Sequence, residues 1–259
     1  MKFKLILRQK QGNKIPFNYQ YPLSSALYKI IQKADEKYSQ LLHDEGFGKG
    51  FKFFTFSDLN FKCFKWDKEG IIISDNESLL LFVDIYIPKT THSLIKGFFE
   101  DKLITIADCN LKTEFYIDSV EMIDDMLCNK APNEVIKVKV QPTSPLVVGK
   151  KNKNGNYDYL LPSDEDYKEF LLKNWIEKAK VFNNNDTFDL LEINILNKEN
   201  AKTRLITLKA HTPQETKIRG SKNFYIELIG RKKDIEPLIY GGLGIYNAQG
   251  MGSVKIIEI

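Results

Sequence analysis

The chain of 259 residues has only three cysteines, and their spacing suits neither a metal site nor a disulfide framework. Cys63, Cys109 and Cys128 are odd in number and form no CxxC pair. No uninterrupted apolar run approaches the roughly 20 residues that a bilayer-spanning helix needs. The N-terminal segment alternates apolar and charged residues, unlike a signal peptide. We therefore expect a cytoplasmic protein in a reducing environment, without membrane association.

Signatures of nucleotide-binding and metal-dependent enzymes are also missing. The chain contains no GxxxxGK[ST] loop, no GxSxG elbow and no HExxH helix. Its histidines, His43, His92 and His211, share no metal-ligand spacing. We interpret His92 and His211 as exposed loop residues, since loops attract polar side chains. The sequence predicts neither a bound metal nor a cofactor.

Arginine is scarce, so lysine supplies most of the positive charge. Arginine occurs only at Arg8, Arg204, Arg219 and Arg231, while the net charge is +4. Lysine is a mobile point charge, which suits contact with phosphate better than the reading of bases. A moderately basic chain permits a polyanionic partner without requiring one.

The order of expected elements repeats, with a break near residue 132. The first half is expected to run strand, helix, strands, helix, strands over residues 2–8, 24–42, 51–87, 91–100 and 103–122. The second half repeats this order over residues 135–148, 163–182, 189–229, 234–240 and 254–259. Ser24 or Ser25 is expected to cap the first helix. We predict an α+β fold of two tandem ferredoxin-like (RRM-like, βαββαβ) domains with antiparallel sheets, over residues 1–132 and 133–259.

Five glycines fall within twelve residues near the C-terminal end, between Gly241 and Gly252. Such a run persists where the backbone needs positive φ or lies close against another group. Successive free N–H groups can form a concave anion site, so a phosphate backbone is one such neighbour. The alternative is a tight turn before the last strand.

Two further features carry charge that could serve chemistry. His43 follows the expected end of the first helix, beside Asp44 and Glu45, and a glycine-flanked Lys49 comes after it. A helix C-terminus and acidic neighbours both favour the imidazolium, which suits proton donation near neutral pH. The alternative is a structural histidine that interacts only with the helix dipole. Basic clusters occur in the second half, and each alone is typical of a solvated turn: Lys150-Lys151-Lys153, Lys217-Arg219-Lys222 and Arg231-Lys232-Lys233.

Two stretches far apart in the sequence resemble one family. Gly242-Leu243-Gly244-x5-Gly250-Met251-Gly252-x-Val254 resembles the C-terminal glycine-rich motif of the RAMP superfamily of CRISPR-associated proteins. Tyr28, His43 and Lys49 resemble the catalytic set of its repeat-processing endoribonucleases, the sixth Cas family. The repeated element order and the segment Ser144-Pro145-Leu146-Val147-Val148 are similar as well, so the resemblance spans the chain.

The resemblance implies a metal-independent endoribonuclease that cleaves precursor CRISPR RNA within each repeat. The products would carry 2′,3′-cyclic phosphate and 5′-hydroxyl ends, and no cofactor is implied. Tyr28 would activate or position the 2′-hydroxyl, His43 would protonate the leaving oxygen, and Lys49 would stabilise the developing charge. A tyrosine with an ordinary pKa of about 10 is protonated at neutral pH, so the acid and base roles of Tyr28 and His43 can be exchanged.

The resemblance places RNA binding in the second half of the chain. The loop residues implied are Gly242, Gly244, Tyr246, Gly250 and Gly252. The basic clusters of the second half together suggest a phosphate-tracking surface, so Lys217, Arg219, Lys222 and Arg231 are candidate RNA ligands as well. Where the family often has lysine, a small hydroxyl residue and an aromatic residue, this loop has Tyr246, Ala248 and Met251, so Tyr246 could stack on a base instead.

The implied partner is CRISPR repeat RNA, bound as a single strand or a hairpin. Association with other Cas proteins of an effector complex, or as a homodimer, stays open. The alternative function is a non-catalytic RAMP-type subunit that holds CRISPR RNA in an effector complex. Such a subunit has no use for Tyr28, His43 and Lys49 together. Generic RNA binding by an RRM-like sheet is less favoured, because no RNP1-like aromatic signature lies in a strand.

Overall fold

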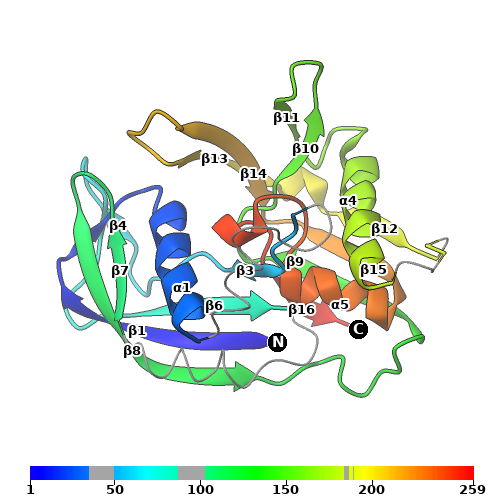
Figure 1. Cartoon of the computed structure of the whole chain (residues 1–259), viewed down its shortest axis with the longest axis horizontal. Coiled ribbons are helices and arrows are strands. Elements are labelled where there is room, and N and C mark those ends of the chain that lie inside the picture. Colours follow the sequence, from blue (N-terminus) through cyan, green and yellow to red (C-terminus); the bar gives the residue numbers. More distant parts are fainter. Residues whose placement is uncertain (35–49, 87–102, 184–186, 189) are drawn as a thin grey trace.

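The computed structural model describes residues 1–34, 50–86, 103–183, 187–188 and 190–259. Two antiparallel sheets, one from each half of the chain, lie side by side with their helices (Figure 1). Across these ranges, no helix has both the length and the apolar character needed to cross a membrane.

The first half forms a five-stranded sheet with the strand order β3-β6-β1-β8-β7. Its elements are β1 (Lys2–Gln11), α1 (Gln20–Ala34), β3 (Phe54–Phe56), β6 (Ser78–Ile85), β7 (Leu103–Ala107) and β8 (Lys112–Ile123). Alternation in β1 sends Phe3, Leu5 and Leu7 to one face, where they join Leu23 and Leu27 of α1 in a common core. The helix expected at 91–100 lies outside the described residues.

The second half forms a four-stranded sheet with the order β12-β15-β9-β16. Its elements are β9 (Val135–Pro142), α4 (Tyr167–Phe182), β12 (Glu192–Leu196), β15 (Tyr225–Arg231), α5 (Lys232–Gly241) and β16 (Val254–Glu258). The second sheet thus places its strands in the ferredoxin-like order second, third, first, fourth. The first sheet has the same order in β3-β6-β1-β8, with β7 added at the edge beyond β8, and the predicted fold class is confirmed. The domain limit at residue 132 stays a prediction; it falls between β8 and β9.

Hairpins and short elements are inserted into these two units. They are a three-stranded sheet of β2 (Lys14–Ile15), β5 (Ile71–Ile72) and β4 (Lys65–Trp66), the hairpin β10 (Val148–Lys151) with β11 (Tyr157–Leu160), the hairpin β13 (Lys202–Leu208) with β14 (Thr216–Lys222), and the 3-10 helices η2 (Lys198–Asn200) and η3 (Asn247–Gln249). The cluster Lys217-Arg219-Lys222 therefore lies on a strand, and its interpretation as a turn was wrong. Ile218, Gly220 and Ser221 of this strand are buried, whereas Lys217 and Arg219 are exposed.

The first helix begins at Gln20, four residues before the expected cap at Ser24. Pro22 lies in its first turn, where a missing N–H costs nothing because that group has no partner within the helix. Ser24 is therefore not a cap. Its hydroxyl instead donates a hydrogen bond to the Ala248 carbonyl oxygen in the second half, at 2.6 Å. Ser25 bonds back to the Tyr21 carbonyl within the helix.

Candidate functional site

The glycine segment Gly241–Val254, called the glycine loop below, lies between the two sheets (Figure 1). Gly242, Gly244, Gly250 and Gly252 have φ between 67° and 90°. A Cβ at Gly244 would lie 2.2 Å from the Val147 carbonyl oxygen. The expectation of positive φ and close approach is confirmed, and the neighbour is the protein itself. These four glycines are buried, so their part in RNA binding stays a prediction, and residues 245–249 form the partly exposed part of the loop.

A lysine from α4 supports the loop from inside. The ammonium of Lys178, which is only 1% exposed, donates to the carbonyl oxygens of Gly242 (2.6 Å) and Gly244 (2.8 Å) and to Oδ1 of Asn247 (2.7 Å). Burial lowers the pKa of Lys178 to about 7, whereas the three acceptors favour the ammonium. The Phe51 ring of the first half lies 5.8 Å from the same ammonium. The loop is thus built around an internal cation.

Hydrogen bonds anchor the loop to the first half. Besides the bond from Ser24 of α1, Thr55 Oγ1 of β3 donates to the Met251 carbonyl oxygen at 2.8 Å. Ser253 Oγ donates to the buried carboxylate of Asp84 on β6 at 2.9 Å. The loop therefore lies at the interface of the two halves.

Tyr28 lies one helical turn after Ser24, on the side of α1 that faces the loop. Its ring packs edge-to-face on Phe54, with centroids 5.2 Å apart. Its hydroxyl is buried and has no hydrogen-bond partner among the described residues. Burial raises the pKa of Tyr28 above its ordinary value, so the phenol holds its proton at neutral pH. The site thus contains a buried O–H donor for which the described residues supply no acceptor.

Lys52 places a cation beside this phenol. Its Nζ lies 5.1 Å from the centroid of the Tyr28 ring, and burial lowers its pKa. His43 and Lys49 lie outside the described residues, so their roles stay predictions. The sequence interpretation missed Lys52, although the run Lys49-Gly50-Phe51-Lys52 holds a second lysine three residues on.

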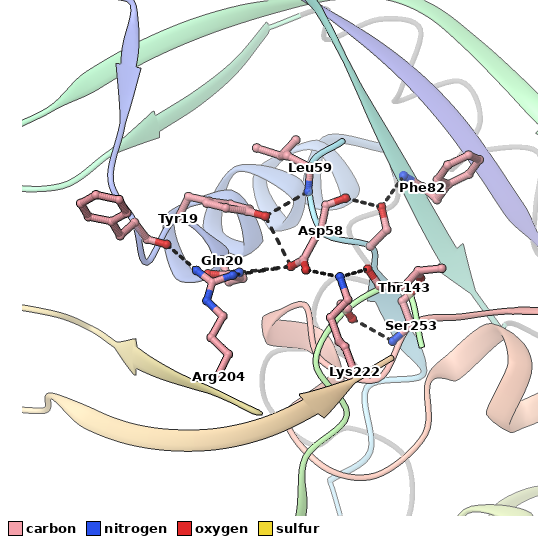
Figure 2. A network of polar contacts seen from close by, with 12 residues as sticks. Tyr19, Gln20, Asp58, Leu59, Phe82, Thr143, Arg204, Lys222 and Ser253 are labelled. Atoms are coloured by element: carbon pink, nitrogen blue, oxygen red, sulfur yellow. Dashed lines mark hydrogen bonds and ion pairs between the residues drawn. The ribbon is translucent and has the colours of Figure 1, made fainter. Parts of the chain in front are cut away.

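Lys222 takes part in an ionic contact between the halves (Figure 2). Its Nζ lies 2.7 Å from Oδ2 of Asp58, and Arg204 lies 4.0 Å from Oδ1 of the same carboxylate. Tyr19 and Gln20, at the start of α1, also donate to Asp58, at 3.4 and 3.3 Å. Lys222 therefore ties β14 to the first half, and its role as an RNA ligand stays a prediction.

The other basic candidates do not gather at one place. Arg231 donates to Asp234 Oδ2 and to the Thr187 carbonyl oxygen, both at 2.8 Å. It precedes α5, whose 10 residues separate it from the loop by about 15 Å. Lys217 and Arg219 are exposed on β14, two residues apart and hence on one face of the strand.

Aromatic side chains surround the remaining candidate, Tyr246. It has φ 62° and ψ 28°, and its hydroxyl lies 3.2 Å from that of Tyr159 on β11. The sequence interpretation missed Tyr157 and Tyr159, whose alternation in the run Tyr157-Asp158-Tyr159 already places both rings on one face of a strand.

The described residues hold no cluster of three His, Cys, Asp or Glu side chains that could bind a metal ion. His211 is an exposed turn residue, as expected, and His92 lies outside the described ranges. The expectation of a reaction without metal stays a prediction.

Comparison with known proteins gives matches over both halves. The family model described as CRISPR-associated protein Cas6, N-terminal, matches residues 14–121, and the model for the Cas6 C-terminal part matches residues 129–256. The CRISPR-associated endoribonuclease Cas6 1 of Methanocaldococcus jannaschii is 27% identical over 185 residues, which are 71% of this chain and 67% of that relative.

Two solved structures share the fold over the full length. A Cas6-related protein of Pyrococcus furiosus has a TM-score of 0.75 at 22% identity, covering 100% of this chain and 98% of its own. A structure described as a RAMP protein binding different RNA substrates has a TM-score of 0.76 at 20% identity, covering 100% of both chains. At these identities the two structures establish the fold alone.

Proposed function

Because this chain belongs to the Cas6 family of CRISPR-associated proteins, we propose that it is an endoribonuclease that cleaves precursor CRISPR RNA within its repeats. The M. jannaschii relative carries that activity in its name. The geometric observation that carries the proposal is the bond from Ser24 to Ala248, which sets the glycine loop against the helix that bears Tyr28. An RNA strand bound by the loop would then lie beside the buried hydroxyl of Tyr28.

The loop offers donors for the RNA backbone. The N–H groups of Tyr246, Asn247 and Ala248 have no acceptor within the described part of the chain, and they lie in its partly exposed section. Successive free N–H groups bind anions such as phosphate. The buried glycines and Lys178 fix the backbone that presents these groups.

The proposed reaction is a transesterification without metal. The 2′-oxygen forms a bond to the adjacent phosphorus while the bond from phosphorus to the 5′-oxygen breaks. The 2′-hydroxyl loses a proton and the leaving 5′-oxygen gains one, which gives 2′,3′-cyclic phosphate and 5′-hydroxyl ends. The step needs a proton acceptor, a proton donor and positive charge near the phosphate.

The raised pKa of Tyr28 argues against its acting as the general base. A phenol that keeps its proton can orient the 2′-hydroxyl or give a proton to the leaving oxygen, but it is a poor base at neutral pH. In the first case His43 is the acid and a water molecule accepts the proton of the 2′-hydroxyl; in the second His43 is the base. The pH dependence of single-turnover cleavage separates them: the rate falls above the pKa of His43 if it is the acid and falls below that pKa if it is the base. Lys49 would stabilise the charge on phosphorus in both cases.

The test is incubation with labelled repeat RNA in excess EDTA, followed by analysis of the product ends. We expect cleavage at one position, with cyclic phosphate and 5′-hydroxyl ends. His43→Ala should bind the RNA and fail to cleave it. Inhibition by EDTA, or full activity of His43→Ala, would overturn the mechanism. Binding without cleavage by the unmodified protein would instead identify a non-catalytic RAMP subunit.

A further inference from the structure

Three tyrosines gather where the glycine loop meets the β10–β11 hairpin. The rings of Tyr157 and Tyr159 are stacked, with centroids 6.4 Å apart and an interplanar angle of 27°. Tyr246 lies 6.3 Å from the first ring and 6.5 Å from the second. All three side chains are partly exposed, so they do not simply fill a core. We call them the tyrosine cluster.

The backbone at Tyr246 is an unusual place for a large side chain. The loop uses glycine at four other positions with positive φ, yet at φ 62° it has tyrosine. A non-glycine residue in the left-handed region costs on the order of 1 kcal/mol or more. Strain of this kind concentrates at functional sites, where the side chain contributes something that glycine cannot.

The surroundings of the cluster are cationic. Lys151 Nζ lies 5.8 Å from the centroid of the Tyr157 ring. The strand β11 lies against β14, which exposes Lys217 and Arg219, and both hairpins project from the same side of the molecule in Figure 1. Aromatic rings beside a basic groove are the common means of holding single-stranded nucleic acid, because every base has a face that can stack.

We propose that Tyr157, Tyr159 and Tyr246 form a stacking subsite for an unpaired base of the RNA substrate. The loop runs from Tyr246, in this cluster, to Ala248, which is bonded to the helix that bears Tyr28. An RNA strand bound along the loop would thus contact the tyrosine cluster near Tyr246 and would lie close to Tyr28 near Ala248. The subsite rests on the proposed function for its substrate, and it adds the contact that selects an unpaired nucleotide beside the cleavage site.

The test uses repeat RNAs in which 2-aminopurine replaces one nucleotide at a time. Stacking on tyrosine should quench the fluorescence at one position near the cleavage site when the protein binds. Tyr157→Leu, which keeps an apolar side chain but removes the ring, should abolish that quench and weaken binding about tenfold. Tyr159→Phe keeps the ring and loses only the hydroxyl contact, so it should bind almost as well as the unmodified protein.

Tyr116→Leu is the matched control. Tyr116 is 48% exposed on β8 and also lies near a lysine, with Lys10 Nζ 5.4 Å from its ring centroid, but it belongs to the other half. Its replacement should leave affinity and quench unchanged. Equal affinity of the Tyr157→Leu and Tyr116→Leu variants would overturn the subsite.

An RNA-side substitution covers the case in which Tyr157→Leu disturbs the hairpin. An abasic nucleotide at the quenched position should weaken binding to the unmodified protein about as much as Tyr157→Leu does, and the two changes together should cost no more than one. Additive losses would overturn the subsite. If the RNA is cleaved but neither the tyrosine substitution nor the abasic nucleotide changes binding or quenching, the stacking subsite is wrong and the proposed nuclease activity stands. If quenching depends on the tyrosine but no RNA is cleaved, the proposed nuclease activity is wrong and the subsite stands.

Discussion

The first helix of each half faces the glycine loop, and the two helices bring opposite kinds of buried group to it. From α4, Lys178 has three acceptors for its three N–H donors. From α1, Tyr28 has a buried hydroxyl that meets no acceptor in the described ranges. A satisfied buried group stabilises the fold, whereas an unsatisfied one costs free energy until a ligand arrives. We therefore expect Lys178 to stabilise the loop and Tyr28 to take part in the proposed reaction.

The largest effect is expected from Lys178→Met. The substitution keeps the volume but leaves the carbonyl oxygens of Gly242 and Gly244 and the Asn247 side chain without their donor. Unsatisfied buried acceptors cost free energy, so we expect the free energy of unfolding to fall by about 3 kcal/mol. Repeat RNA should bind more weakly as the loop loses its shape. Urea unfolding and RNA titration measure the two losses.

Lys180→Met, on the same helix but half exposed, is the control and should change little. The pH dependence of the free energy of unfolding gives a second test of Lys178. The pKa of Lys178 is about 7 when folded, below its ordinary 10.5, so the unfolded chain holds more protons between these values. Stability of the unmodified protein relative to Lys178→Met should therefore rise with pH across this window. A stable variant would show that Lys178 does not organise the loop, whereas a flat difference would show that the three acceptors offset the effect of burial on the pKa of Lys178.

Tyr28→Phe should have the opposite effects, with stability preserved and the cleavage rate lowered. The ring and its contact with Phe54 remain, and the hydroxyl that is removed has no partner within the described ranges, so the free energy of unfolding should be unchanged or slightly higher. The single-turnover cleavage rate should fall about a hundredfold or more, the usual contribution of a positioned proton donor. Tyr19→Phe is the contrasting variant, because the Tyr19 hydroxyl is bonded to Asp58 and Leu59; it should lose stability instead. A Tyr28→Phe enzyme with full activity would remove Tyr28 from the reaction.

The sequence predicted the features that depend on local pattern, which are the two ferredoxin-like units and the position of the glycine loop. Alternation and helical spacing gave both ferredoxin-like units, and glycine spacing located the loop, because these signals are set by neighbours in the chain. The partners of the loop were not predictable in this way. Lys178 reads as one of many lysines on an amphipathic helix, and only the tertiary fold buries it. Ser24 was expected to cap the helix because serine is a common cap, but the helix begins at Gln20 and includes Pro22 in its first turn.

The smallest effect is expected from Ser24→Ala, which tests whether the two regions are coupled. It removes one hydrogen bond between the halves, from Ser24 Oγ to the Ala248 carbonyl oxygen, and should lower the free energy of unfolding by about 1 kcal/mol. Because this bond sets the loop against α1, the cleavage rate should fall several-fold. The RNA affinity should stay within twofold, which is a change in binding free energy of about 0.4 kcal/mol or less. Ser25→Ala, which breaks a bond within the same helix, should leave the rate unchanged. Equal rates for the two variants would mean that the loop and Tyr28 act independently, and that Tyr28 is positioned by α1 alone.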